Sequence, residues 1–197
     1  MALSFFISGF SAAEHNAEQL FTLYRDSANT AYLEKLIALY GDALYHYLAR
    51  QSSRSLAEDV SQQCWLKLLE QPYSFRGNSS FKTWLFSVGR NCLIDEMRRH
   101  KYWQTELDMA LLSAEVAGDD GSCPVAQLSQ SQCQLKWAEQ LALLPFLQRE
   151  ALMLQLEGFS LEQISTITGQ GEETIKSRLR YARQALQPLN GDSHEQA

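Results

Sequence analysis

Proline and glycine are scarce in this chain, which has only 4 prolines and 10 glycines among its 197 residues. Long stretches contain neither residue, whereas a strand-and-turn protein needs both at its many turns. The scarcity therefore favours helices. With 45% apolar and 20% charged residues, the composition is that of a globular protein and not of a disordered one. The sequence contains no internal repeat and no convincing strand pattern.

Cysteine pairs of the metal-binding or redox type are also missing. The four cysteines are Cys64, Cys92, Cys123 and Cys133, and no two of them form a C-x-x-C pair, so no zinc site or redox motif is predicted. Cys64 and Cys92 lie on apolar helical stripes, where a small buried thiol is expected. Cys123 and Cys133 lie in a polar segment, where ordinary free thiols are expected and redox sensitivity is the alternative.

Long hydrophobic runs and catalytic constellations are absent as well. No stretch approaches the roughly 18 apolar residues of a membrane span, and the apolar N-terminus lacks the preceding Lys or Arg of a signal peptide. We therefore expect a cytoplasmic protein with no membrane insertion. The four histidines are scattered, and no metal, nucleophile or phosphate-loop spacing occurs. We expect no catalytic residues, no metal, no cofactor and no enzymatic activity.

The charge of the chain is unevenly distributed. The net charge of -6 alone disfavours a simple DNA-binding protein. Residues 76–103, however, contain six basic and only two acidic residues, whereas residues 104–134 contain five acidic and no basic residues. Such blocks indicate separate tasks along the chain, and a phosphate-binding surface needs only local positive charge.

Hydrophobic periodicity predicts helices before and after this acidic segment. In the first half they cover about residues 30–49, 55–71 and 81–102. A capping box of Ser55 and Glu58 is predicted to begin the second of these helices. Residues 73–80 are predicted to form a loop.

In the second half, helices are predicted over about residues 135–143, 146–157, 160–168 and 172–186. Pro145 suits a first helical position, and Ser160 with Gln163 fits a capping box. We therefore predict an all-α fold with two small helical domains. The predicted divisions are an N-terminal extension (1–29), a first domain (30–103), a flexible linker (104–134), a second domain (135–188) and a tail (189–197).

The last two helices form a helix–turn–helix pattern, in which the second helix enters the major groove of DNA. At about 100° per residue, an apolar stripe of Ile175, Leu179, Ala182 and Leu186 faces the core. The opposite face can reach bases with Glu173, Thr174, Ser177, Arg180, Tyr181 and Gln184, and the flanks can reach phosphates with Lys176, Arg178 and Arg183. The alternative is an ordinary solvated amphipathic helix.

Several stretches together resemble bacterial sigma factors. Residues 57–68 (AEDVSQQCWLKL) resemble the polymerase-binding helix, and residues 81–99 (FKTWLFSVGRNCLIDEMRR) resemble the promoter-melting and minus-ten helix. Residues 158–164 (GFSLEQI) and 174–179 (TIKSRL) resemble the minus-thirty-five helix–turn–helix. Their order and separation are similar to those of the extracytoplasmic-function (ECF) group, which keeps only domains two and four.

The resemblance implies a factor that binds core RNA polymerase and promoter DNA, and it leaves open an anti-sigma factor as a further partner. For polymerase binding it implies Asp59, Gln62, Gln63 and Leu66. For the minus-ten element it implies Phe75, Arg76, Asn78, Ser79, Ser80, Arg90, Asn91, Arg98 and Arg99. For the minus-thirty-five element it implies Glu173, Thr174, Lys176, Ser177, Arg178, Arg180, Tyr181 and Gln184. Gln63 departs from the acidic residue that the family often has there.

Some of these assignments have structural alternatives. Trp84 is more simply explained as core, while Phe75, in the predicted loop, is expected to be free to cage an unstacked base. Ser79 and Ser80 are explained equally well as helix caps. Arg178 on the recognition helix is expected to meet a DNA phosphate. We also hypothesise that the acidic linker stays flexible, and that the free protein binds promoters poorly until polymerase separates its two domains.

Three other functions remain to be distinguished. A helix–turn–helix regulator would bind duplex DNA without core polymerase, but it would leave residues 57–68 and 81–99 unexplained. A sigma mimic that only titrates an anti-sigma factor should have lost the basic recognition face, which is present here. An enzyme would need a catalytic constellation, and none is present in the sequence.

Overall fold

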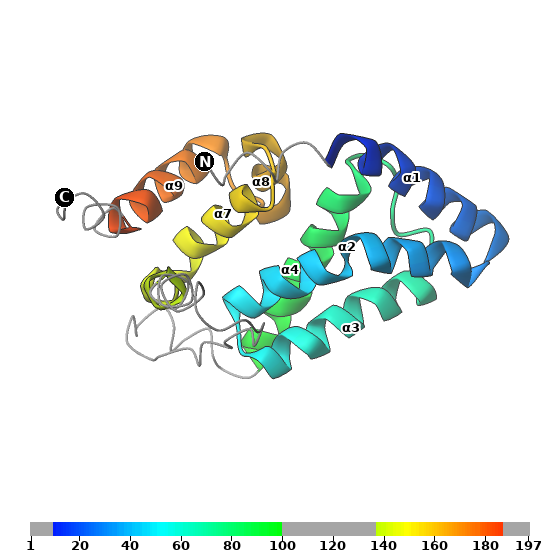
Figure 1. Cartoon of the computed structure of the whole chain (residues 1–197), viewed down its shortest axis with the longest axis horizontal. Helices are drawn as coiled ribbons and strands as arrows, with labels where there is room; N and C mark the ends of the chain where they lie inside the picture. The colour runs from blue at the N-terminus through cyan, green and yellow to red at the C-terminus, as the bar shows by residue number, and fades with distance from the viewer. Residues whose placement is uncertain (1–9, 100–136, 187–197) are drawn as a thin grey trace, which may run out of the picture.

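The computed structural model describes residues 10–99 and 137–186, with side chains from residue 17 onwards, and every regular element in these ranges is an α-helix. The prediction of an all-α fold is confirmed. The helices are α1 (Phe10–Ser27), α2 (Thr30–Gln51), α3 (Arg54–Glu70), α4 (Phe81–Arg99), α7 (Phe146–Leu156), α8 (Leu161–Thr168) and α9 (Glu172–Leu186) (Figure 1). Residues 137–143 are also helical. Among the described helices, none is both long and apolar enough to cross a membrane. The predicted linker, residues 104–134, lies outside the described residues.

The helices of the first half begin at polar caps. The Asn29 side chain accepts a hydrogen bond from the Ala31 amide and begins α2, close to the predicted boundary. Helix α3 begins one residue earlier than predicted, because Ser53 caps it by accepting from the Leu56 amide. The predicted capping box of Ser55 and Glu58 is therefore wrong. Glu58 instead pairs with Arg54, at 3.2 Å across one helical turn.

Helix α1 packs against both α2 and α4, although no helix was predicted before residue 30. Its inward side includes Leu20, Phe21 and Tyr24, which are all buried. Glu18 Oε1 accepts a hydrogen bond of 2.8 Å from the Phe81 amide at the first residue of α4. A carboxylate at that end also interacts favourably with the helix dipole. Part of the proposed N-terminal extension therefore contributes to the same core as residues 30–99.

The second half forms the helix–turn–helix that the sequence predicts. Ser160 and Gln163 make the predicted capping box at the start of α8. Gly169 ends α8 with φ +67, a left-handed conformation that glycine adopts without strain, and α9 follows at Glu172. Pro145 was predicted to be the first helical residue of α7. In the structure it is the N-cap residue, and α7 begins at Phe146.

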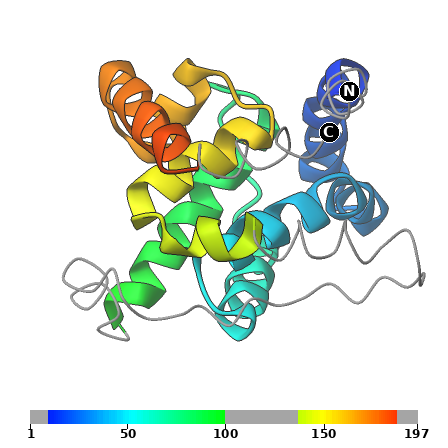
Figure 2. The ribbon, with the colours of Figure 1, turned by 60° about the vertical axis from the view of Figure 1, so that its left-hand side comes forward.

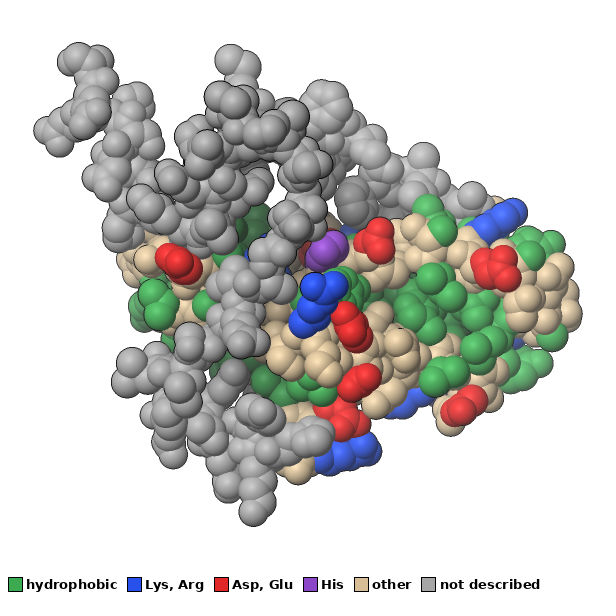
Figure 3. Space-filling model, turned by 60° about the horizontal axis from the view of Figure 1, so that its bottom comes forward, with side chains coloured by type: hydrophobic (Ala, Val, Ile, Leu, Met, Phe, Trp, Pro, Cys, Tyr) green, Lys and Arg blue, Asp and Glu red, His purple; other side chains and the backbone are tan. Residues whose placement is uncertain are grey.

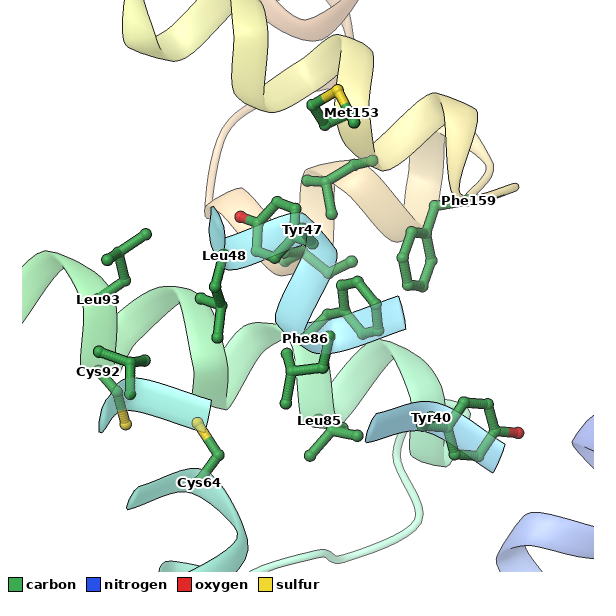
Figure 4. Packing of buried hydrophobic residues seen from close by; sticks show 14 of the residues in the cluster. Tyr40, Tyr47, Leu48, Cys64, Leu85, Phe86, Cys92, Leu93, Met153 and Phe159 are labelled. Atoms are coloured by element: carbon green, nitrogen blue, oxygen red, sulfur yellow. The ribbon is translucent and has the colours of Figure 1, made fainter. Parts of the chain in front are cut away.

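The two halves lie against each other (Figure 2) and share one apolar core. Helix α8 packs against α4, and α7 packs against α2. At the centre of this contact, the rings of Phe86 on α4 and Phe159 before α8 lie 4.9 Å apart in an edge-to-face arrangement. The Tyr47 ring lies 5.4 Å from that of Phe86, and Met153 belongs to the same cluster (Figure 4). The α7–α9 unit therefore sits directly on the α1–α4 unit.

Candidate nucleic-acid and partner interfaces

The predicted polymerase-binding residues meet on one surface of α3. Asp59, Gln62, Gln63 and Leu66 line an open hollow of about 280 Å³ together with Leu56 and Glu96. The opposite side of α3 is fully buried through Val60, Cys64 and Leu68. Because the core occupies that opposite side, the polar side chains that α3 contributes to the hollow face outward.

Exposed apolar side chains lie at and near the hollow, and they are not part of the buried core. Leu66 is 54% exposed, and Leu69 on the same helix and Tyr73 after it are also exposed. Figure 3 looks onto the underside of the molecule as drawn in Figure 1, and apolar side chains there form a continuous area among scattered charges of both signs. Exposed apolar surface edged by polar groups is typical of a protein-binding site.

Phe75 does not present a free ring, contrary to our expectation from the sequence. It is only 8% exposed, and its ring lies 5.3 Å from that of Phe21, 5.7 Å from that of Phe81 and 5.4 Å from that of Trp84. Phe21 belongs to α1, so the burial of Phe75 depends in part on a helix that was not predicted from the sequence. In this arrangement the ring belongs to the core and is not available for stacking on a base. Trp84 also packs against this core, as predicted.

The rest of the loop divides into cap residues and exposed residues. Ser80 Oγ accepts a hydrogen bond of 3.2 Å from the Thr83 amide, so the capping alternative is confirmed for Ser80. Ser79 is half-buried and donates to the Ser80 carbonyl at 3.3 Å. Arg76 and Asn78 are exposed. Of the five loop residues predicted to contact the minus-ten element, these last two are the exposed ones.

The basic end of α4 is exposed, but its side chains already have intrahelical partners. Arg98 lies 3.8 Å from Asp95, and Arg99 lies 2.6 Å from Glu96. The Arg98–Asp95 pair is exposed, and exposed pairs contribute little to stability, so exchanging Asp95 for a phosphate would cost Arg98 little. Glu96, in contrast, is buried. Asn91 is exposed on the same helix.

Arg90 is the exception on α4, because it turns toward α7. Its Nε lies 2.7 Å from Glu150 Oε1 and its Nη2 lies 3.2 Å from Glu150 Oε2, and the Glu150 side chain is fully buried. The Tyr47 hydroxyl donates to the same carboxylate at 3.4 Å. Burial raises the pKa of Tyr47 well above its ordinary value, and the charge of Glu150 raises it further. Arg90 is therefore engaged within the protein.

The recognition helix α9 has the predicted phase. Ile175, Leu179, Ala182 and Leu186 are buried, as the helical periodicity requires. The residues expected to contact DNA are otherwise exposed, and they are Glu173, Thr174, Lys176, Ser177, Arg180, Tyr181 and Gln184. Lys176 pairs with Glu173 at 2.7 Å, and the Arg180 guanidinium lies 5.0 Å from the centre of the Tyr181 ring.

Arg178 differs from the other basic residues of α9. It is half-buried, and its Nη1 atom is enclosed without a hydrogen-bond partner among the described residues. Burial lowers the pKa of Arg178, and the charges of Glu150 and Arg90 act on it in opposite directions. In this arrangement Arg178 faces the contact between the two units and is not at the free surface where a phosphate would bind.

Further polar contacts join the two units. Lys82 Nζ on α4 donates to the Glu157 carbonyl at 2.7 Å and lies 4.6 Å from the centre of the Phe159 ring. Arg149 Nε on α7 donates to Gln51 Oε1 at 3.3 Å. None of these contacts, least of all that of Glu150, was predicted from the sequence. The only signal was a charged pair, Arg149 and Glu150, inside an otherwise apolar helix.

The sequence matches known families in the order in which these surfaces occur. Residues 36–102 match the profile of Sigma-70 region 2, and residues 134–186 match that of Sigma-70, region 4. The chain is 34% identical over 139 residues to the ECF RNA polymerase sigma factor EcfG of Rhodopseudomonas palustris, covering 68% of this chain and 70% of the relative. It is 28% identical to the RNA polymerase sigma factor YlaC of Bacillus subtilis, covering 88% of this chain and 97% of the relative.

A solved structure has the same fold. The sigma factor RpoE, determined in complex with the anti-sigma factor NepR from Bartonella quintana, superposes with a TM-score of 0.62 and 30% sequence identity. The match covers 82% of this chain and 98% of that one. With both profiles matched in order and with relatives above 30% identity, the chain belongs to the RNA polymerase sigma factors of the extracytoplasmic-function group.

Proposed function

We propose that this sigma factor binds core RNA polymerase through the α3 hollow and reads promoters with two further surfaces. Exposed residues of the 73–80 loop and of α4 contact the minus-ten element, and the exposed face of α9 contacts the minus-thirty-five element. The observation that carries the proposal is the α3 hollow, in which four residues implied by the family resemblance share one outward surface that retains exposed apolar area. A helix–turn–helix regulator that acts alone would have no use for this surface.

The proposed partners follow from the family. We place the protein in the cytoplasm, where core polymerase and promoter DNA are found, as a non-catalytic initiation factor without metal or cofactor. An anti-sigma factor is a further proposed partner, since the similar sigma factor from Bartonella quintana was determined with one. The decisive experiment is in vitro transcription from genomic DNA with core polymerase. Promoter-specific transcripts only when this protein is added are the expected result, and binding to duplex DNA without any effect on core polymerase would support the regulator instead.

Removal of two polar groups beside the α3 hollow should weaken polymerase binding. Asp59→Ala combined with Gln62→Ala is expected to raise the Kd for core polymerase by about tenfold or more, in the range of interface residues that matter. Both side chains are exposed, so the melting temperature should stay unchanged. Fluorescence anisotropy with labelled protein measures the affinity. Glu34→Ala removes an exposed carboxylate from α2 and serves as the control, and an unchanged affinity in the double variant would refute the assignment.

Substitutions on the recognition helix should have different effects at residues that contact bases and at residues that contact phosphates. Arg180→Ala is expected to relax the preference at one minus-thirty-five position, at a cost of about 1–3 kcal/mol. Lys176→Ala is expected to weaken all sequences alike and to lower the salt slope by about one. Lys176 is the better phosphate probe than Arg178, because Arg178 is half-buried. Transcription of a randomised minus-thirty-five library with each holoenzyme distinguishes the two effects, and a shifted preference with Lys176→Ala alone would show that the roles are reversed.

A further inference from the structure

Two cysteines that lie 28 positions apart in the sequence meet between α3 and α4. Cys64 on α3 and Cys92 on α4 point their sulfur atoms toward each other, and both side chains are buried (Figure 4). Gly89, one turn before Cys92, packs against Leu44 and lies next to Cys64. A Cβ at Gly89 would lie 3.7 Å from Cys64 Sγ and only 2.8 Å from Leu44 Cδ1. No redox motif is visible in the sequence, because helix packing and not local spacing brings these thiols together.

A lysine completes the cluster. Lys67 lies one turn after Cys64 on α3, and its Nζ donates a hydrogen bond of 3.0 Å to Cys92 Sγ. Lys67 is an exposed residue, so Cys92 lies just beneath the protein surface at this point. A cysteine that served only as a small apolar core residue would gain nothing from an ammonium group at this distance. A thiolate, in contrast, is stabilised by it.

The two thiols are electrostatically unequal. The hydrogen bond from Cys64 and the hydrogen bond and charge of Lys67 lower the pKa of Cys92 to about 6, against the opposing effects of burial and of Asp95. The interaction with Cys92 and burial raise the pKa of Cys64. At neutral pH the cluster therefore contains one thiolate and one thiol. This is the arrangement of a nucleophilic cysteine beside a resolving cysteine.

We propose that Cys64 and Cys92 form a reversible redox site that reacts with two-electron oxidants of the peroxide class. The Cys92 thiolate attacks one peroxide oxygen, the O–O bond breaks, and the departing hydroxide is protonated to water, which leaves a sulfenic acid on Cys92. Cys64 then attacks the Cys92 sulfur, the S–O bond breaks, and the hydroxyl group leaves as water with the Cys64 proton. In sum, two thiols and one hydrogen peroxide give one disulfide and two waters. An external dithiol reverses the reaction.

The disulfide would connect two helices that have different tasks in the proposed function. Helix α3 carries the polymerase-binding hollow on its outer side, and α4 carries the basic minus-ten residues. Oxidation also removes the thiolate charge, so Lys67 loses its anionic partner. The redox chemistry itself does not depend on the proposed function, because it needs only the three side chains of the cluster.

The test uses the full-length protein with Cys123→Ser and Cys133→Ser, so that only the cluster can react. After treatment with hydrogen peroxide, peptide mapping without reductant should find residues 64 and 92 linked, with the loss of two hydrogens, and dithiothreitol should restore both thiols. Before oxidation, alkylation of Cys92 by iodoacetamide should be half-maximal near pH 6. Two unlinked thiols after oxidation, or oxidation of Cys92 to a sulfinic acid without linkage, would overturn the proposal.

Two variants separate the roles within the cluster. Cys64→Ser keeps a hydroxyl donor beside Cys92, so peroxide should give a sulfenic acid that dimedone traps, but no cross-link. Cys64→Ala serves the same purpose if the buried serine destabilises the core, and circular dichroism checks the fold of each variant. Lys67→Gln should slow alkylation of Cys92 at pH 7 by several-fold and shift its pH midpoint upward. An unchanged rate and midpoint in Lys67→Gln would show that Cys92 is not activated by this lysine, and would overturn its part of the site.

Discussion

Glu150→Gln is expected to separate the α7–α9 unit from the α1–α4 unit without unfolding either. The carboxylate of Glu150 is fully buried and accepts hydrogen bonds from Arg90 and Tyr47. Its charge also interacts with the guanidinium group of Arg178. The variant removes the negative charge and leaves two guanidinium groups in the contact. Leaving a buried charge without its partner typically costs about 3–5 kcal/mol. The apolar contact around Phe86 and Phe159, with the hydrogen bonds of Lys82 and Arg149, would then have to hold the two units together without the ion pair.

Two measurements follow this separation. The radius of gyration from small-angle X-ray scattering should increase, because the units remain tethered only by the segment between them. Binding of a promoter fragment to the free protein should also become stronger, since opening exposes Arg90 and Arg178. Glu139→Gln changes an exposed carboxylate in the helical segment 137–143 and is the matched control. An unchanged radius of gyration and unchanged DNA binding in Glu150→Gln would show that the ion pair does not hold the closed form.

The closed arrangement gives a physical reason why the free protein should bind promoters poorly. Arg90, which was predicted to contact the minus-ten element, is occupied by Glu150, and Arg178, which was predicted to contact a phosphate, is half-enclosed beside them. Binding to polymerase would have to separate the units before both cations could contact DNA. Our hypothesis from the sequence placed the inhibition in the acidic linker, whereas the described contacts place a direct restraint between the two DNA-binding units.

The sequence predicted those parts of the fold whose information is local. Periodicity identified α2, α4, α8 and α9, and the Ser160 capping box marked the start of α8 correctly because a cap depends on residues only three positions apart. The buried stripe of α9 and the outward surface of α3 were also predictable, since the core side of an amphipathic helix determines its exposed side.

The features that the sequence did not predict depend on partners that are distant in the chain. Helix α1 has only a short apolar side, and the burial of that side depends on Phe75 and Phe81, which lie far along the chain. The role of Glu150 depends on its ion pair with Arg90 on α4, which lies 60 positions earlier in the sequence. The pairing of Cys64 with Cys92 likewise requires the crossing of two helices. Polar and aromatic residues of this kind are therefore assigned roles by tertiary contacts and not by spacing.

Phe21→Ala tests the most consequential of these contacts, and it is expected to destabilise the protein by about 3–5 kcal/mol. Phe21 is 1% exposed, and its ring lies 5.3 Å from the rings of both Phe75 and Phe81. Its removal leaves a cavity in the aromatic cluster and takes away one of the two edge-to-face partners of Phe75, the other being Phe81. The free energy of unfolding from urea titration, monitored by circular dichroism, measures the loss.

The same variant should also release the loop after α3. Phe75 anchors residues 73–80 only through this cluster, so limited proteolysis should cleave the loop faster in Phe21→Ala than in the unaltered protein. Leu23→Ala is the control on the same helix, because Leu23 is an exposed leucine and its truncation should change stability by less than about 0.5 kcal/mol. If Phe21→Ala proved no more destabilising than Leu23→Ala, then α1 would not be part of the cooperative fold. Phe75 would in that case be free to contact a base, as the sequence alone had suggested.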